Sequence, residues 1–489
     1  MFITNDRRAT GAAHDINRDN PWLVIGIGLG IYALIMMTGT RLLDDPDSHW
    51  HIHVGARILA EGHFPQTDAY SHSFAGAPWI AKEWLSQVLF ALAHRIGGWF
   101  GVVALSAFAA ALALALLARE LLARLPLAPA LALTGFALLC TIQHLLARPH
   151  VLAMPVMVMW FILLLRAAET ARLPSLAALP LMAWWSNLHG SFTFGLAFGG
   201  LLVIEAAMRA APGERLRLVL GWAAFGLAAL FAACLHPYGP EVIAAAIRVL
   251  DLGAAKTVIM EWRPQDFSSF GLFEAFLLAG LGLALVLGLR LSPFRTVLLL
   301  LLLHLALSHF RHVTTLGLIG PLVVAPALVR RPEPMANPAG RAGGRLAAAL
   351  ALGLTGLVAV TGLTAAAGRH FAPAPRWMPE AALAAARQAG LTGRVFNDYA
   401  FGGYLIAQGV PTFIDGRAEL YGGPFMVDVI RAMGLKDVAR LDAILDSGQV
   451  QWTLLEPSTP AVAYLDRKPG WRRVYADEVA VVHAREAGR

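Results

Sequence analysis

The chain has 489 residues, of which 57% are hydrophobic and only 15% charged, and its net charge is +7. An ordinary soluble protein carries roughly 25% charged residues, so this composition, with its repeated long apolar runs, excludes a soluble globular protein. The basic charge does not indicate nucleic-acid binding, because the arginines are scattered between apolar runs as topology determinants are. Cys140 and Cys234 lie within apolar runs and indicate neither a disulfide framework nor a metal site.

The apolar runs predict an α-helical polytopic membrane protein with about 11 transmembrane helices, because one crossing needs roughly 20 apolar residues. A polar tail, 1–20, precedes a transmembrane domain over 21–368. The segment 174–208 has two short halves and fits either two spans or a re-entrant hairpin. The expected spans are 21–40, 99–118, 128–146, 150–166, 174–188, 190–208, 218–235, 268–289, 294–308, 313–329 and 346–364.

The connectors between these spans alternate between two kinds. One kind is rich in arginine, and the positive-inside bias places it in the cytoplasm together with the N-terminus. The other holds most of the histidines and several carboxylates, and it includes 42–98 and everything after Gly368. We therefore expect a multi-pass protein of a bacterial inner (plasma) membrane, with this second set facing the periplasm or cell exterior.

The first outer connector, 42–98, is the longest and opens with Asp44-Asp45-Pro46-Asp47-Ser48-His49-Trp50-His51-Ile52-His53. Its pattern predicts two amphipathic helices on the membrane surface, over 47–60 and 79–96. A carboxylate at this position could act as a general base or bind a divalent cation. The alternative is that Asp44 and Asp45 only mark the polar end of the first span.

Further polar residues gather at the same edge of the expected bundle. Arginine suits a phosphate or pyrophosphate because its guanidinium offers planar, bidentate donors, although arginines also anchor helices beside lipid phosphates. The candidates for binding a donor phosphate are Lys82, Arg148, Arg263 and Arg311. The residues expected to line the site are His49, His51, His144, Asn187, His189, His236, His309 and His312.

A transition-metal site has little support in the histidine spacing. On a helix, His49, His51 and His53 point in different directions, whereas His309 and His312 could share a face. The chain contains neither an HExxH nor a CxxC pattern. The metal ligands are therefore left unknown, and Mg or Mn is left open as a cofactor.

The tail, 369–489, is expected to be a separate extracytoplasmic α/β domain. The Gly402-Gly403 pair indicates a tight backbone approach, and Asp415-Gly416-Arg417 a turn at a strand end. Asp415 and Arg417 could pair to hold the domain fold, or this edge could face the membrane part and help to hold an acceptor. Strands are expected at 394–396, 412–414, 452–455, 471–475 and 479–483, and helices at 379–389 and 438–445.

The run from Asp45 to Gly62 places an acidic pair after a span, then an aromatic and histidine stretch, then Ala56-Arg57-Ile58-Leu59-Ala60-Glu61-Gly62. It resembles the first periplasmic loop of the GT-C superfamily of integral-membrane glycosyltransferases. That group includes protein O-mannosyltransferases, aminoarabinose transferases of lipid A and lipopolysaccharide galacturonosyltransferases. The resemblance implies a GT-C-like fold, a sugar donor carried on polyprenyl phosphate, and an inverting transfer on the outer leaflet to a lipid, glycan or protein acceptor.

The resemblance also implies that Asp47 is the catalytic base. Ser48 follows Asp47 where the family commonly has a second acidic residue, so the base works alone or with Asp45 or Glu83. Two other functions remain open: a transporter or lipid flippase, and a non-catalytic protein of envelope polysaccharide assembly. Transporters usually place polar residues near mid-bilayer, whereas here they lie at one edge. A non-catalytic protein would tolerate the loss of Asp47.

Overall fold

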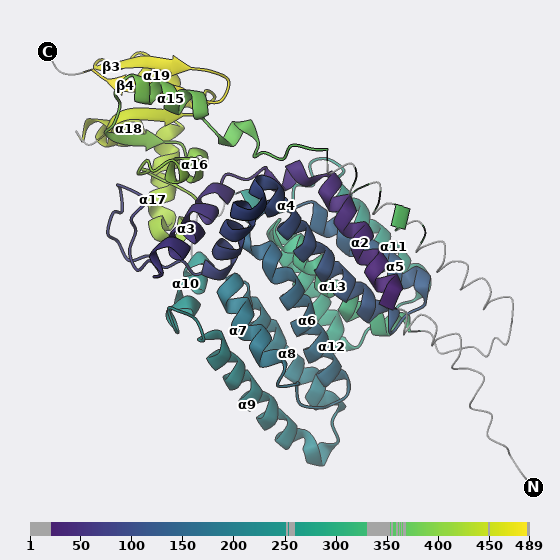
Figure 1. Cartoon of the computed structure of the whole chain (residues 1–489). Coiled ribbons are helices and arrows are strands. Elements are labelled where there is room, and N and C mark those ends of the chain that lie inside the picture. The colour runs from purple at the N-terminus through teal and green to yellow at the C-terminus, as the bar shows by residue number, and fades with distance from the viewer. Residues whose placement is uncertain are drawn as a thin grey trace, which may run out of the picture.

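The computed structural model describes residues 21–250, 253, 260–329, 353, 356–357, 360, 362, 364, 368–447 and 450–486. They form an apolar helical bundle and a smaller C-terminal region that combines a β-sheet with helices (Figure 1). The predicted fold class is thereby confirmed. The expected span over 346–364 lies largely outside the described residues.

The bundle consists of long apolar helices joined by short connectors. Four helical segments, Trp84–Leu122, Pro149–Glu169, Phe192–Arg209 and Pro212–Ala233, are long and apolar enough to cross a membrane, which makes this a multi-pass membrane protein. The helices of the bundle are α2 (Pro21–Met37), α4 (Trp84–Leu122), α5 (Leu127–Ile142), α6 (Pro149–Glu169), α7 (Ala178–Leu188), α8 (Phe192–Arg209), α9 (Arg215–Ala233), α11 (Leu272–Leu287), α12 (Pro293–Ser308) and α13 (His312–Leu328).

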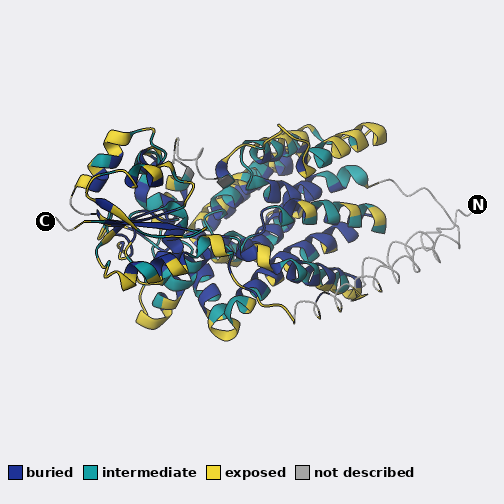
Figure 2. Cartoon of the chain, turned by 90° about the horizontal axis from the view of Figure 1, so that it is seen from above, coloured by how far each residue is buried: buried dark blue, intermediate teal, exposed yellow. Residues whose placement is uncertain are grey.

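Helix α6 lies at the centre of the bundle, and its neighbours include α4, α7, α8 and α13. Its side chains are almost all buried, among them Trp160 and Phe161. The outer helices instead leave large apolar side chains exposed, such as Leu285 and Val286 of α11. Figure 2 shows exposed and half-buried segments along the outside of the bundle and buried ones within it. Exposed leucine and valine are stable against lipid, so this distribution fits a bundle that is surrounded by a bilayer.

The first outer connector forms structure of its own between α2 and the membrane part of α4. It contains the 3-10 helix η1 (Gly39–Leu43) and the helix α3 (Ser48–Glu61), which matches the amphipathic helix expected over 47–60. The surface helix expected over 79–96 corresponds to the first half of α4. Gly97 and Gly98 break α4 at this point, and Gly98 has a φ of +57°, which glycine adopts without a steric penalty.

The C-terminal region is built on a four-stranded mixed sheet of order β1-β2-β4-β3, in which only the β1–β2 pair is parallel. Alternate strand residues face two separate hydrophobic clusters, so that Phe396 packs with α17 to α19 and Val395 with α15 and α16. The elements are α15 (Glu380–Gln388), β1 (Arg394–Asn397), α16 (Gly402–Ala407), α17 (Ala418–Met433), α18 (Val438–Asp446), β2 (Val450–Leu455), α19 (Pro460–Leu465), β3 (Trp471–Ala476) and β4 (Val481–Arg485).

One predicted strand is wrong. The segment 412–414 is not part of the sheet; instead, Thr412 forms an isolated parallel bridge with Ser71 of the first outer connector. The Thr412 N–H donates to the Tyr70 carbonyl (3.0 Å), and the His72 N–H donates to the Thr412 carbonyl (2.9 Å). The extended backbone was predicted correctly, but its partner belongs to another part of the chain.

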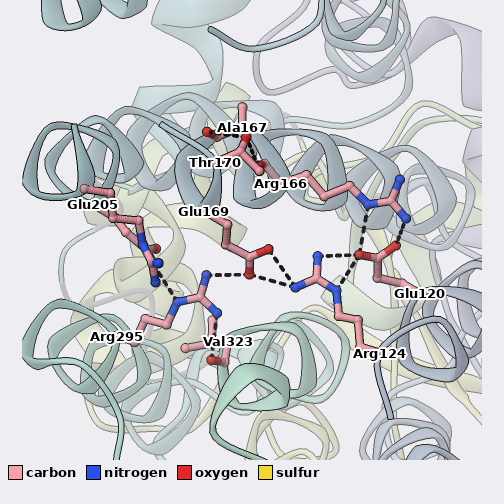
Figure 3. A network of polar contacts seen from close by, with 10 residues as sticks. Glu120, Arg124, Arg166, Ala167, Glu169, Thr170, Glu205, Arg295 and Val323 are labelled. Carbon is pink, nitrogen blue, oxygen red and sulfur yellow. Dashed lines mark hydrogen bonds and ion pairs between the residues drawn. The ribbon is translucent and has the colours of Figure 1, made fainter. Parts of the chain in front are cut away.

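A chain of arginines and glutamates links the helix ends that lie away from α3 and the C-terminal region (Figure 3). Arg295 of α12 contacts Glu169 of α6 (2.8 Å) and Glu205 of α8 (2.9 Å). Glu169 also contacts Arg124 (2.7 Å), which in turn contacts Glu120 of α4. This network ties together the ends of α4, α6, α8 and α12.

Candidate functional site

The two aspartates of the first outer connector enter the site from the turn that joins η1 to α3. Asp47 occupies the N-cap position of α3, where an aspartate side chain ordinarily accepts a helix N–H, but here it makes no such bond within the described residues. Its Oδ2 lies 2.8 Å from Nη2 of Arg148 instead. Asp45 is completely buried, and it accepts from the Ser48 hydroxyl (3.1 Å) and from Arg148 Nε (2.7 Å).

Arg148 stands immediately before α6 and brings three carboxylates together. Besides Asp45 and Asp47, its Nη1 donates to Oε2 of Glu261 (3.0 Å). Glu261 belongs to the 3-10 helix η4 (Met260–Trp262), which precedes α11. One guanidinium thus connects the first outer connector, the start of α6 and the connector before α11.

Glu261 also contacts residues from two other connectors, Arg311 and His144. Arg311 Nη1 lies 3.5 Å from Glu261 Oε1, and the Arg311 guanidinium stacks over the Trp262 ring at 4.7 Å. His144 Nε2 lies 3.4 Å from Glu261 Oε2, and His309 Nδ1 is 2.9 Å from the Trp262 carbonyl. The site therefore carries two arginines within reach of one glutamate.

The three carboxylates do not share the same electrostatic environment. Burial opposes ionisation of Glu261, but Arg311 and Arg148 together hold its pKa well below the usual range. Burial is the largest influence on Asp47 and raises its pKa. Arg148 lowers this pKa and Asp45 raises it, and the net result is a pKa of about 7. A carboxylate with a pKa near neutrality can accept a proton and return it at working pH.

Lys82 of the first outer connector is held from the C-terminal region. Its Nζ lies 2.6 Å from Glu419 Oε1, at the start of α17, and both side chains are largely buried. Glu83 lies 3.5 Å from His189 Nε2, and His236 contacts the Lys82 carbonyl at 3.2 Å. Lys82 and Glu83 are thus held by His236, His189 and Glu419, from three other parts of the chain.

The other predicted site residues differ in what they contact. His49 packs edge-on against Trp99 and against Tyr404 of α16, and burial lowers its pKa to about 4. Asn187 of α7 accepts from Trp84 Nε1 (2.5 Å), at the start of α4, and donates to the carbonyl of Leu235 (2.9 Å), which follows α9. These two hydrogen bonds join the three segments.

The histidines at the outer edge form ring contacts rather than a ligand shell. His144 stacks on His150 at 5.5 Å, and His309 lies 5.9 Å from His312, which follows Arg311. His51 stacks on Trp50 inside α3. Among the described residues, no group of three or more His, Cys, Asp or Glu side chains is arranged to hold a metal ion.

Arg263, the other arginine candidate, follows Trp262 in the connector before α11. Its side chain is exposed, and its backbone carbonyl accepts from the Phe310 N–H (2.9 Å), so that its connector pairs with the turn before α13. The neighbouring Arg311, from that turn, is the arginine that reaches Glu261.

The C-terminal region closes over the two aspartates by backbone contact. A Cβ on Gly403 would lie 2.1 Å from the Pro46 carbonyl oxygen, and a Cβ on Gly416 would lie 1.9 Å from Oδ1 of Asp47. Only glycine leaves room at either position. The tight approach indicated by Gly402-Gly403 is therefore made against the turn that carries Asp47.

A buried ion-pair network fixes this closure. Arg417 pairs with Asp415 (2.7 Å) and with Asp68 of the first outer connector (2.6 Å), and all three side chains are fully buried. The Arg417 guanidinium also lies over the rings of Trp79 (4.9 Å) and Tyr70 (5.2 Å). Asp415 and Arg417 thus stabilise their own domain and dock it onto the membrane part.

Four residues of this arrangement were not predicted from the sequence: Glu261, Asp68, Glu419 and Tyr399. Glu261 stands two positions before the candidate Arg263 in an outer connector, so a search for carboxylates as well as arginines there would have found it. Tyr399 follows β1 and lies in the electrostatic field of Asp47, which together with burial holds its pKa well above the usual range. Nothing in its local pattern indicates this neighbour.

Comparison with known proteins gives likenesses to solved structures. No family model and no curated protein matches the chain. The structure is similar to the archaeal oligosaccharyltransferase AglB from Archaeoglobus fulgidus, solved in complex with an inhibitory peptide and a dolichol-phosphate. The TM-score is 0.49 and the sequence identity 12%, over 89% of this chain and 69% of that chain.

Proposed function

We propose that this protein transfers a sugar from a polyprenyl-phosphate donor to a hydroxyl-bearing acceptor at the outer face of a bacterial inner membrane. The observation that carries the proposal is Asp47, a buried carboxylate with a pKa of about 7, in a site that also contains Arg311 and Lys82. Transfer from a lipid phosphate needs one group to accept a proton and another to receive a phosphate anion. Both kinds of group meet at this edge of the bundle.

The proposed reaction is a single inverting displacement. Asp47 takes the proton of the acceptor hydroxyl while the acceptor oxygen forms a bond to the anomeric carbon. The bond between that carbon and the phosphate oxygen breaks, and its electron pair leaves with the polyprenyl phosphate. Because the phosphate departs as an anion, it needs neighbouring positive charge more than a proton donor.

Of the predicted phosphate-binding residues, Arg311 is the best placed for this role. Arg148 already contacts three carboxylates, and Lys82 is paired with Glu419. The Arg311 guanidinium approaches Glu261 through Nη1 at 3.5 Å and lies over the Trp262 ring. Among the described residues Glu261 is its one ion-pair partner, so its remaining N–H groups can donate to a phosphate.

The test is transfer of a radiolabelled sugar from a panel of polyprenyl-phosphate sugars by protein in lipid nanodiscs. Asp47→Asn should lower the rate by at least ~100-fold, the size expected for a general base. Asp44→Asn is the matched control, since Asp44 lies in the same turn but contacts Arg376 and Trp377 of the C-terminal region. Transfer that persists in Asp47→Asn would contradict the assignment, and silence across the panel would favour transport or envelope assembly.

A further inference from the structure

The three carboxylates of the site converge on a guanidinium. Arg148 places nitrogens 2.5 Å from Asp45, 2.8 Å from Asp47 and 3.0 Å from Glu261. Arg148 also donates charge-assisted hydrogen bonds to Asp45 from Nε (2.7 Å) and to Glu261 from Nη1. Arg148 is itself fixed by its connector, because the preceding Ala147 N–H donates to the Leu42 carbonyl (2.7 Å) of η1.

A divalent cation does not fit this arrangement. Mg²⁺ requires oxygen ligands at about 2.0–2.1 Å in near-octahedral geometry, and here guanidinium nitrogens stand between the carboxylates where such an ion would have to lie. Asp45 has no freedom to turn away, because it is fully buried and also accepts from Ser48. A doubly charged ion beside Arg148 would in addition meet the like charge of the guanidinium.

We infer that Arg148 is the resident cation of this site, that it excludes a divalent metal ion from the carboxylates, and that transfer proceeds without one. The inference rests on the proposed function for its statement about transfer. Arg148 then acts as a positioning residue: it orients Asp45 and Glu261 and holds Oδ2 of Asp47, while Oδ1 of Asp47 packs against Gly416.

The charges of the site agree with this assignment. Arg148 pairs with Asp45, Asp47 and Glu261, and Arg311 pairs with Glu261, so the carboxyl groups already have cationic partners from the chain. Nearby positive charge lowers the pKa of Asp47, as Arg148 does, so a bound divalent ion would oppose protonation of Asp47 further.

Removing the guanidinium should therefore create a metal site. In Arg148→Met, three carboxylates would face a space without a cation, and oxygen ligands of this kind bind Mn²⁺ and Mg²⁺. Arg148→Lys keeps one positive charge in the same place and should remain free of metal. Arg376→Met is the matched control, since it removes the arginine paired with Asp44 outside the site.

The experiment is a Mn²⁺ titration followed by electron paramagnetic resonance on protein purified with EDTA. We expect Arg148→Met to bind one Mn²⁺ at least roughly tenfold more tightly than wild type, Arg148→Lys or Arg376→Met, and to lose this binding when Asp45→Asn is added. Wild-type transfer should be the same with EDTA or with Mn²⁺.

Two results would overturn the inference. One is a tight Mn²⁺ site in the wild type that Asp45→Asn removes, and the other is a folded Arg148→Met variant that binds no Mn²⁺. If Arg148→Met does not fold, the Mn²⁺ titration of the wild type and Asp45→Asn still tests whether the wild-type carboxylates bind a metal ion. If no donor supports transfer, the proposed function fails, whereas the titration tests the role of Arg148 independently.

Discussion

Of the three carboxylates of the site, Asp47 has the fewest contacts with Arg148 and Arg311 to offset the cost of its burial. Asp45 receives two nitrogens of Arg148 and the Ser48 hydroxyl, and Glu261 lies between Arg148 and Arg311. Asp47 meets the same guanidinium through a single 2.8 Å contact. Because pairs of carboxylates with different environments separate into charged and protonatable groups, Asp47 is the group that takes up the proton.

The pH dependence of transfer should report this group. The pKa of Asp47 is about 7, and the basic form is needed, so the rate should rise as the pH increases through about 7 and fall toward acid. Glu261→Gln removes a negative charge that raises this pKa, so it should move the rise to lower pH. The measurement is a pH–rate profile from pH 5 to 9 for both proteins; a wild-type rate that does not vary across this range would contradict the assignment.

The same raised pKa has a consequence for stability. A carboxyl group whose pKa is higher in the folded than in the unfolded protein favours folding fully only below the unfolded pKa, about 4, and this contribution is lost as the pH rises from there through the folded value, here about 7. Asp47→Asn should therefore raise the melting temperature more at pH 8 than at pH 5. Thermal unfolding in detergent measures both, and a variant less stable than wild type at pH 8 would be the opposite result.

The sequence was enough to select the aspartates of the first outer connector as site residues. It was not enough to predict which of them takes up the proton. Three acidic residues directly after a span are unusual, and that alone predicts a site. Which carboxylate remains protonatable depends on Arg148, 103 positions from Asp45, and on Glu261, 113 positions further along. Local pattern carries no information about contacts across such separations.

At the scale of elements, the docking of the C-terminal region onto the first outer connector decides the shape of the site. A Cβ on Gly416 would overlap Oδ1 of Asp47, so Gly416→Ala should displace the carboxylate and lower transfer by at least ~10-fold, comparable to misplacing a reacting group by about 1 Å. Gly368→Ala is the control, since a Cβ there meets open space.

Limited proteolysis shows whether the domain is still docked in each of these variants. Full activity in a docked Gly416→Ala protein would show that the backbone contact does not position Asp47.

The elements themselves were largely predictable because amphipathic and apolar periodicity depends on near neighbours. The helix over 47–60 and the break near Gly98 followed from such patterns, and the glycine pair at 402–403 indicated a close approach. The error at 412–414 has the same origin. A Thr-Phe-Ile run favours extended backbone, but only the three-dimensional structure shows that its partner is the backbone of residues 70–72.

At the scale of the whole molecule, one end of the bundle carries the candidate site and the other carries the arginine–glutamate network. The arginine-rich connectors, expected from their charge to mark one side of the membrane, carry side chains that pair with Glu120, Glu169 and Glu205 (Figure 3). The distribution of arginines and histidines in the sequence was enough to distinguish the two ends of the bundle. Of the arginine–glutamate pairs, the sequence spacing indicates only the i,i+4 pairs Glu120–Arg124 and Glu205–Arg209.

This network should be structural and separable from the site. Arg295→Met would leave Glu205, which is almost fully buried, with one partner fewer, and breaking a buried pair costs about 3–5 kcal/mol. Arg166→Met removes a half-exposed guanidinium, and Glu120 keeps its contact with Arg124, so this change should cost less. We expect a clear drop in melting temperature for the first variant alone, with transfer per folded molecule unchanged in both. A specific loss of transfer would show that the two ends are coupled.

The buried pair between Asp68 and Arg417 joins residues that lie 349 positions apart. Ribosomes add about 5–20 residues per second, so the loop that carries Asp68 leaves the ribosome roughly 20–70 s before its partner exists. During that interval Arg148 is already available to Asp45 and Asp47, but Asp68 has no Arg417 to pair with. A nascent chain therefore cannot complete the site until the C-terminal region has been made, and an incomplete product would leave Asp68 without this partner.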